Sequence, residues 1–305
     1  MRAVVLPLVV GIDGSAESLG AVDWAVDEAL LRGLPLRLVH ASLWDRYEGG
    51  FPRGESAVNG SAGTFDRLVE GAAQRAHRRS GGAVGVSAVT VTEEPVSVLL
   101  DEGRNASALV LGSHGRSGVA DLLLGSVGLA VASRADCPVV VLRGGRPAGT
   151  KPRPGPRIVL GIGRPEPPGA GEEPEHRQPA AAVRFAVEEA RARRVPLLAM
   201  RAWRCPAHEE AEHPLLAGEP ARHHARRAAE ALEAALRDVA PDVELERRTV
   251  EGPARKVLLD ASHGAGLLVI GARRRDGRFG LQIGRVAHTL LHHCACPVAV
   301  VPERW

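Results

Sequence analysis

The chain has 305 residues, of which 45% are apolar and 25% are charged, and its formal net charge is +3. This composition is typical of an ordinary soluble globular protein, and the small positive excess argues against a nucleic-acid-binding surface. The apolar stretch Met1–Val10 is too short to span a bilayer and lacks a signal-peptide cleavage site, so we interpret it as part of a first strand and expect no membrane association. Four cysteines are too few for a disulfide framework, so we expect the protein to reside in the reducing environment of the cytoplasm.

In the first half of the chain, short apolar runs alternate with amphipathic stretches, which predicts strands and helices in alternation. We expect strands at Val4–Ile12, Leu36–Ala41, Val84–Val91, Ala108–Gly112 and Val139–Arg143. We expect helices at Ser18–Arg32, Thr64–Arg79, Val96–Gly103 and Ser126–Arg134. This order favours an α/β fold with a doubly wound parallel sheet, in which ligands bind beyond the carboxyl ends of the strands.

The second half of the chain repeats the first. Leu109–Gly112 recurs as Leu268–Gly271, an offset of 159 residues, and Val10–Ile12 recurs as Leu160–Ile162, an offset of 150 residues. Each copy is long enough to bury one core, and the stretch between the copies is rich in glycine and proline, as linkers are. We therefore expect one domain at residues 1–143, a linker at residues 144–157 and a second domain at residues 158–305.

The most informative stretch of the sequence follows the apolar run that ends at Leu111. It reads Gly112-Ser113-His114-Gly115, and after nine further residues Gly125-Ser126 opens an amphipathic stretch. Glycine lets the backbone approach a ligand closely, and the N-terminus of a helix is a favourable place for an anion. Asp13 ends the first expected strand and would lie on the same edge of the sheet. We therefore expect a phosphate here, carried by a nucleotide.

These residues resemble the universal stress protein family, in particular its members with two tandem domains. The stretch Gly112-x2-Gly115-x9-Gly125-Ser126 matches the ATP-binding pattern of that family without a gap, and Asp13 and Cys137–Val141 match it as well. The resemblance extends over essentially the whole chain. It implies two tandem Rossmann-like domains, each with a five-stranded parallel sheet of strand order 3-2-1-4-5.

The resemblance also implies a nucleotide site in the first domain. Ser126 and the backbone of the motif glycines would hold the triphosphate of ATP, and Asp13 would lie near the ribose or a divalent cation such as magnesium. Ala41 would flank the adenine, and His114 and Val127 would contact the ligand. The implied binding residues are Gly11, Ile12, Asp13, Ala41, Gly112, His114, Gly115, Gly125, Ser126 and Val127. These residues could also have structural roles in place of binding roles. The glycines could serve only to reverse the chain, and Ser126 or Asp13 could serve only to cap a helix.

The second copy departs from this pattern at three motif positions, where Arg274, Arg285 and Gly163 replace Gly115, Ser126 and Asp13. Arginine is bulky enough to fill the space that a phosphate needs. We therefore expect that the second copy does not bind ATP in the manner of the family. The alternative is an anion site of another kind, in which arginine side chains bind the phosphate. Its members would be Arg273, Arg274, Arg275, Arg278 and Arg285.

One cluster has the residue types of a zinc site, Cys205-x2-His208-x4-His213. It lies in a stretch rich in proline and glutamate, whereas a zinc site needs a compact tetrahedral set of ligands. Cys296 is the repeat partner of Cys137, so we interpret both as small apolar residues at the entry of a strand. We expect no metal ligands among these residues.

No catalytic set accompanies the glycine motif in the sequence. It has no Walker-type Gly-Lys-Ser/Thr, no Ser–His–Asp order and no paired carboxylates near the motif, and His114 is the only nearby candidate for proton transfer. We therefore expect a nucleotide-responsive regulator of a stress or dormancy response. Its ligand would be ATP, with at most slow hydrolysis, and its assembly a homo-oligomer such as a dimer of tandem chains. The alternatives are an ATP-dependent hydrolase or transferase, and a scaffold whose site is vestigial in both copies.

Overall fold

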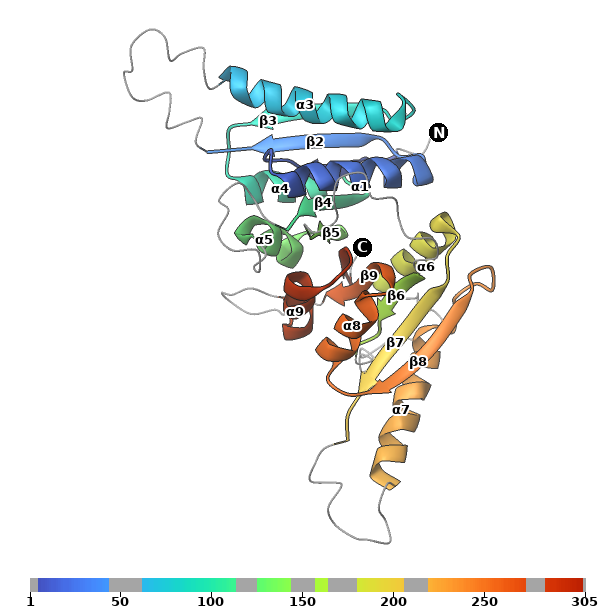
Figure 1. The fold of residues 1–305 in the computed structure, drawn as a ribbon. Coiled ribbons are helices and arrows are strands. Elements are labelled where there is room, and N and C mark those ends of the chain that lie inside the picture. The colour runs from blue at the N-terminus through green and yellow to red at the C-terminus, as the bar shows by residue number, and fades with distance from the viewer. Residues whose placement is uncertain are drawn as a thin grey trace, which may run out of the picture. The chain divides into compact units, whose positions relative to one another are not determined.

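The computed structural model describes residues 5–43, 62–113, 125–143, 157–163, 180–205, 219–272 and 283–303. Two compact units form, the first around strands β1–β5 and the second around strands β6–β10. Each unit is a parallel sheet with helices on both faces (Figure 1). Within the described residues, no helix combines the length and the apolar character that a bilayer crossing requires.

The first unit alternates strands and helices along the chain, as the sequence predicts. Its strands are β1 (Leu8–Gly11), β2 (Leu36–Ala41), β3 (Val86–Val91), β4 (Ala108–Gly112) and β5 (Val139–Leu142). Its helices are α1 (Ala16–Arg32), α3 (Ala62–Ser80), α4 (Pro95–Gly103) and α5 (Ser126–Arg134). The strands are parallel and lie in the order β3-β2-β1-β4-β5, which confirms the expected fold class and strand order.

The second unit repeats this arrangement. Its strands are β6 (Arg157–Gly161), β7 (Leu197–Trp203), β8 (Leu245–Glu251), β9 (Ala265–Ala272) and β10 (Val298–Pro302). Its helices are α6 (Ala181–Arg193), α7 (Glu219–Ala235), α8 (Ala254–Ser262) and α9 (Arg285–His293). These strands are also parallel, and β6 lies between β7 and β9, so the strand order is again 3-2-1-4-5.

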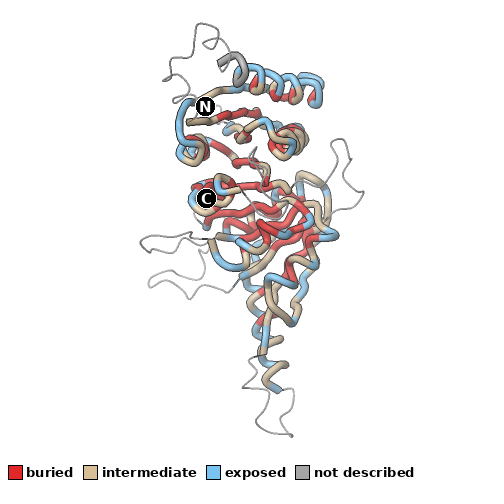
Figure 2. The backbone as a smooth tube through the Cα atoms, turned by 60° about the vertical axis from the view of Figure 1, so that its left-hand side comes forward, coloured by how far each residue is buried: buried red, intermediate tan, exposed pale blue. Residues whose placement is uncertain are grey.

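The core of each unit lies between its sheet and the helices on either face. In the first unit α1 packs beside α3 on one face, and α4 packs beside α5 on the other. The central strands are buried, the edge strands β3 and β8 are half-buried to exposed, and the outer faces of the helices are exposed (Figure 2). Strand β4 is buried from Ala108 to Leu111, with no side chain of that run more than 4% exposed. Burying a leucine of this kind stabilises a fold by roughly 1.5–3 kcal/mol.

Helix α1 begins at Ala16, two residues before the start that the apolar pattern predicts. The reason is a side-chain cap: Ser15 has an extended backbone, and its Oγ accepts a hydrogen bond from the Ser18 N–H at 3.1 Å. The helix ends at Arg32 and is capped by Gly33, which has a left-handed backbone (φ 64°) and whose N–H donates to the Ala29 carbonyl.

Strand β1 is shorter than the predicted range Val4–Ile12. Pro7 has no N–H for the ladder, and its carbonyl instead accepts hydrogen bonds from the N–H and the Oγ of Ser107 at 2.8 and 3.0 Å. Val5, in the preceding residues, is 55% exposed. Strand β3 likewise begins at Val86 instead of Val84, after a turn in which Gly81 and Gly82 have positive φ.

The cysteines at the repeated strand entries are buried. Burial raises the pKa of the Cys137 thiol to about 12, so the group is protonated at neutral pH. A hydrogen bond with Cys294, followed by burial, also raises the pKa of Cys296. None of the four cysteines, all of which lie in the described residues, forms a disulfide bond. Cys137 and Cys296 therefore behave as small apolar side chains, which is the role that their place in the repeat predicts.

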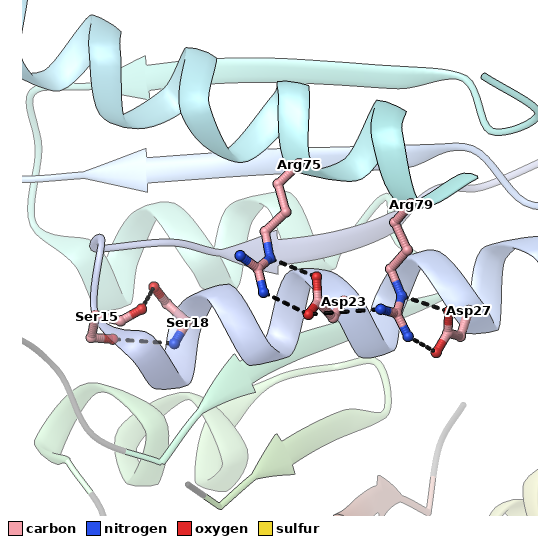
Figure 3. A network of polar contacts seen from close by, with 6 residues as sticks. All are labelled: Ser15, Ser18, Asp23, Asp27, Arg75 and Arg79. Atoms are coloured by element: carbon pink, nitrogen blue, oxygen red, sulfur yellow. Dashed lines mark hydrogen bonds and ion pairs between the residues drawn. The ribbon is translucent and has the colours of Figure 1, made fainter. Parts of the chain in front are cut away.

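A row of ion pairs joins α1 to α3 on the first unit's sheet (Figure 3). Both nitrogens of the Arg75 fork donate to Asp23, at 2.6 and 2.7 Å, and Arg79 makes the same two-bond contact with Asp27, at 2.7 and 2.6 Å. The hydrogen bonds that Arg75 donates to Asp23 raise the pKa of Arg75, and burial acts against them. Arginine and carboxylate bind each other in this paired geometry more strongly than as single contacts.

We expect the Arg75–Asp23 pair to contribute to the stability of the first unit. A double-mutant cycle with Arg75→Ala and Asp23→Ala should give a coupling free energy of unfolding of about 1 kcal/mol, because the pair is partly buried and bidentate. The coupling should weaken at high salt. The matched control is Arg191–Asp242, which has the same geometry but is about half exposed and should couple more weakly. Equal coupling in the two cycles would contradict this expectation.

Candidate functional site

The direction of winding reverses between β1 and β4 of the first unit. From β1 the chain proceeds to β2 and β3, and it then returns to β4 on the other side of β1. Val10 of β1 pairs in register with Val110 of β4, so the carboxyl ends of these two strands lie side by side. Asp13 follows the first and Ser113 the second. This is the edge of a doubly wound sheet at which ligands bind.

Asp13 is held in place by the start of α1. Its Oδ1 accepts hydrogen bonds from the N–H of Ser15 at 3.0 Å and from the Oγ of Ser15 at 2.6 Å. Ser15 Oγ in turn accepts from the Ser18 N–H (Figure 3). The helix cap is therefore Ser15 and not Asp13, which was the structural alternative for Asp13. The hydrogen bonds fix the half-buried carboxylate at the carboxyl edge of the sheet.

Gly14 makes the turn between Asp13 and the helix possible, and the sequence analysis missed it. Its φ is +83°, and a Cβ there would lie 2.8 Å from Cδ1 of Leu68. A residue with a side chain would be strained in this conformation. The available signal was the Asp-Gly dipeptide directly after a buried strand, a pair that often marks a turn.

Gly112 brings the end of β4 against the backbone of α1. A Cβ at this position would lie 2.8 Å from the carbonyl carbon of Glu17 and 2.9 Å from the N atom of Ser18. Such distances do not occur for real side chains, and a backbone atom cannot move away as a flexible side chain can. Glycine is therefore required at 112 for packing. Its contact with a ligand stays a prediction from the sequence.

Gly11 also has a packing role. A Cβ there would meet the side chains of Leu111 at 2.6 Å and Leu99 at 3.2 Å. The second unit repeats this contact at Gly161, where a Cβ would lie 3.0 Å from Leu258 and 3.2 Å from Ile270. Because the unit with the altered motif keeps the same glycine in the same surroundings, the contact with the apolar interior explains this residue.

The loop after β4 leaves and returns at one point. Gly125, which precedes α5, donates its N–H to the carbonyl oxygen of the buried Ser113 at 2.6 Å. The Gly125 N–H thus has an acceptor within the protein, and the contact of the Gly125 backbone with phosphate stays a prediction. The first hydrogen bond of α5 runs from the Leu129 N–H to the Gly125 carbonyl. The amides of residues 126–128 therefore have no acceptor within the helix, and these are the groups that α5 presents to an anion.

The remaining predicted residues divide into described and undescribed ones. Ser126 is exposed and Val127 half-buried at the start of α5. Ile12 is buried, and its N–H donates to the Val39 carbonyl at 2.9 Å. Ala41 ends β2 and is half-buried. The predicted ligand contacts His114 and Gly115 lie outside the described residues, as do Arg274 and the other arginines at 273, 275 and 278.

The same edge of the second unit has different chemistry. Gly163 stands where Asp13 stands in the first unit, and a Cβ on it would meet no atom within 4 Å. Its carbonyl oxygen accepts a hydrogen bond from Nη1 of Arg201 in β7. Helix α6 begins after Ala180 without a side-chain cap, and Arg285 is exposed at the first position of α9. Among the described residues at this edge, the second unit thus has glycine at the place of Asp13 and arginine at positions 201 and 285.

Metal ligands do not gather in the part of the chain that the structure describes. Within those ranges, no group of three or more His, Cys, Asp or Glu side chains is placed to hold a metal ion. His208 and His213 of the sequence cluster lie outside them. His292 is buried near the end of α9, with its ring centre 4.4 Å from that of His288.

We expect Gly112→Ala to destabilise the first unit by about 2 kcal/mol, because the added methyl group meets backbone atoms that cannot give way. Chemical denaturation of both proteins measures the change in the free energy of unfolding. Gly271→Ala is the matched control, since a Cβ at the repeated position in β9 lies 3.6 Å from its nearest neighbour, an ordinary contact. A variant at 112 as stable as the one at 271 would show that α1 and β4 can separate at little cost.

Comparison with known proteins places these two units in one family. The sequence model of the universal stress protein family matches residues 6–143 and 175–302. Two universal stress proteins of Mycobacterium tuberculosis are 31% and 29% identical over 304 and 308 residues, which covers 97% and 98% of this chain and 97% of each relative. The crystal structure of a universal stress protein from Archaeoglobus fulgidus has the same fold, with a TM-score of 0.61, 14% identity and 98% of each chain covered. The chain therefore belongs to the universal stress protein family, with two tandem domains.

Proposed function

We propose that the first unit binds ATP at the edge between β1 and β4, and that the protein is a nucleotide-responsive regulator of a stress or dormancy response. The adenine would lie toward Ile12 and Ala41, and the phosphates toward Ser126 and Val127 at the start of α5. The second unit does not take part in this binding. In this proposal the chain carries one nucleotide.

The observation that carries the proposal is the placing of Asp13. The Asp13 carboxylate is fixed by two hydrogen bonds from Ser15 at the point where the sheet winding reverses. A carboxylate at this point can accept hydrogen bonds from a ribose, as the acidic residue of other doubly wound nucleotide-binding domains does. The amides that begin α5 lie after the neighbouring strand and supply donors for phosphate. One edge thus offers both kinds of group that a nucleotide needs.

The second unit supports the proposal by contrast. It keeps the fold and the packing of Gly161, but glycine replaces the carboxylate at 163, and Arg201 binds the backbone there. Arg285 replaces the serine that begins the corresponding helix. These changes remove the ribose acceptor and the small hydroxyl while leaving the core intact, which favours one site per chain.

A binding role agrees with the groups present in the first unit. Within its described residues, the Asp13 carboxylate at this edge accepts hydrogen bonds from the N–H and the Oγ of Ser15. If ATP binds with magnesium, Asp13 is the oxygen donor at this edge that fits the ion, which would neutralise phosphate charge. A regulator needs no fast chemistry. ATP changes its state only if it binds one conformation or assembly more tightly than another.

Equilibrium dialysis with ATP should give one bound nucleotide per chain. The measurement is made once in buffer with magnesium and once in buffer with EDTA. Mass spectrometry of the protein as purified identifies any adenine nucleotide that stays bound. Two sites of similar affinity would contradict the assignment of the second unit. No binding of any adenine nucleotide would leave the scaffold as the function, and turnover stimulated by a second substrate would favour a hydrolase or transferase.

Two substitutions test the phosphate side of the site. Gly115→Arg copies the residue of the second unit at Arg274 and should weaken ATP binding by about 2 kcal/mol, roughly thirtyfold, because it fills the space for phosphate. Ser126→Ala removes one hydroxyl donor and should cost less, about 1 kcal/mol. Isothermal titration calorimetry measures both. Arg285→Ala at the equivalent place in α9 is the matched control and should bind ATP with the affinity of the wild type. A loss of affinity in this variant would mean that ATP binds to the second unit, against the proposal.

A further inference from the structure

His40 is a buried side chain of β2 that binds the segment carrying Asp13. It is 4% exposed, and its Nδ1 lies 2.8 Å from the carbonyl oxygen of Ile12. A carbonyl oxygen can only accept, so Nδ1 carries the hydrogen and donates it. The Ile12 N–H donates to the Val39 carbonyl at 2.9 Å. Strand β2 therefore holds both polar groups of the residue directly before Asp13.

The bond from the Ile12 N–H is the last of the parallel β1–β2 ladder, and the His40 side chain adds a bond just beyond it. Strand β1 ends at Gly11, and the chain turns sharply at Gly14 into α1. Between them, two side chains hold the peptide that links Ile12 to Asp13: His40 donates to its carbonyl oxygen at 2.8 Å, and Ser18 Oγ accepts from its N–H at 3.4 Å. Ile12 is buried, so without this donor its carbonyl would have to rotate toward another partner or stay unpaired at a free-energy cost. The first outcome alters the backbone from which the Asp13 side chain projects, and the second makes its present orientation less stable.

The second unit uses the same position in another way. Leu36 pairs with Leu8 and Leu197 pairs with Ile158, so Arg201 in β7 stands at the place of His40 in β2. Arg201 also donates to a carbonyl beyond the first strand of its unit, but the acceptor is Gly163, one residue further on. In both units this position binds the chain after the first strand. The imidazole occurs in the unit that has the aspartate, and the longer guanidinium occurs in the unit that has glycine.

We infer that His40 is a positioning residue of the nucleotide site: its hydrogen bond to the Ile12 carbonyl fixes the peptide that presents Asp13 to the ribose or the bound cation. This role rests on the proposed function. It also couples the two sides of the site, because Ala41, the expected neighbour of the adenine, follows His40 directly in β2.

The test compares two substitutions of His40 by their ATP affinity. His40→Leu keeps an apolar side chain of similar bulk but no donor, and it should weaken ATP binding about tenfold. His40→Asn places an amide N–H near the position of Nδ1 and should restore binding to within about threefold of the wild type. Arg201→Leu, the matched change in the second unit, should leave the affinity unchanged. Isothermal titration calorimetry gives the affinities, and His40→Val takes the place of the leucine variant if that protein does not fold.

Hydrogen exchange provides a second measurement that needs no nucleotide. Exchange in the segment from β1 to the first turn of α1 should be faster in His40→Leu and return to the wild-type rate in His40→Asn. If the wild type binds ATP and His40→Leu binds it with the same affinity, the positioning role of His40 is overturned, whatever the exchange rates. The proposed function would still stand. A failure of asparagine to restore binding would also overturn it, because the effect would then come from altered packing. A wild-type protein that binds no ATP would instead remove the proposed function, and this role with it.

Discussion

The candidate site depends on one steric constraint, the contact between the end of β4 and the first turn of α1. At Gly112 the two backbones lie so close that even a methyl group would meet main-chain atoms at 2.8–2.9 Å. This approach places the capped start of α1, with Asp13 and Ser15, against the end of the neighbouring strand. The hydrogen bond between Ser113 and Gly125 then returns the chain to the same edge, where α5 begins. The start of α1, the end of β4 and the start of α5 thus lie at the same edge of the sheet because residue 112 has no side chain.

The repeat supplies an internal comparison of what the fold needs and what the site needs. Gly11 and Gly161 meet equivalent leucines of α4 and α8, so both units retain this packing. At the edge of the sheet the two units differ, with Asp13 against Gly163 and His40 against Arg201. Core packing restricts the choice of residue in every copy of the domain. Ligand binding restricts the residues at the sheet edge only in a copy that binds the ligand. The divergence is therefore what we expect if one unit holds a ligand and the other serves the fold.

Local sequence signals predicted the regular elements well where packing and local preference agree. The bounds of β4 and α5 match the predicted ranges, because an apolar run ends in glycine in the first case and an amphipathic stretch follows glycine in the second. The start of α1 was wrong by two residues, since the apolar period of the helix does not reveal the cap at Ser15. The start of β1 was wrong because Pro7 cannot donate to the ladder and its carbonyl binds Ser107 instead.

The sequence by itself determined the repeat, the doubly wound fold and the family, because hydrophobic period, glycine spacing and chain order are local properties. It also pointed to one edge of the sheet as the candidate site, since Asp13 and the glycine motif both follow buried strands. Only the tertiary structure decided the tasks of individual residues: Gly112 and Gly11 pack, the Gly125 N–H binds Ser113, and Ser15 caps α1. The bond from His40 to Ile12 joins residues 28 positions apart. Such contacts arise from the distance between elements in the fold, and spacing along the chain does not contain that distance.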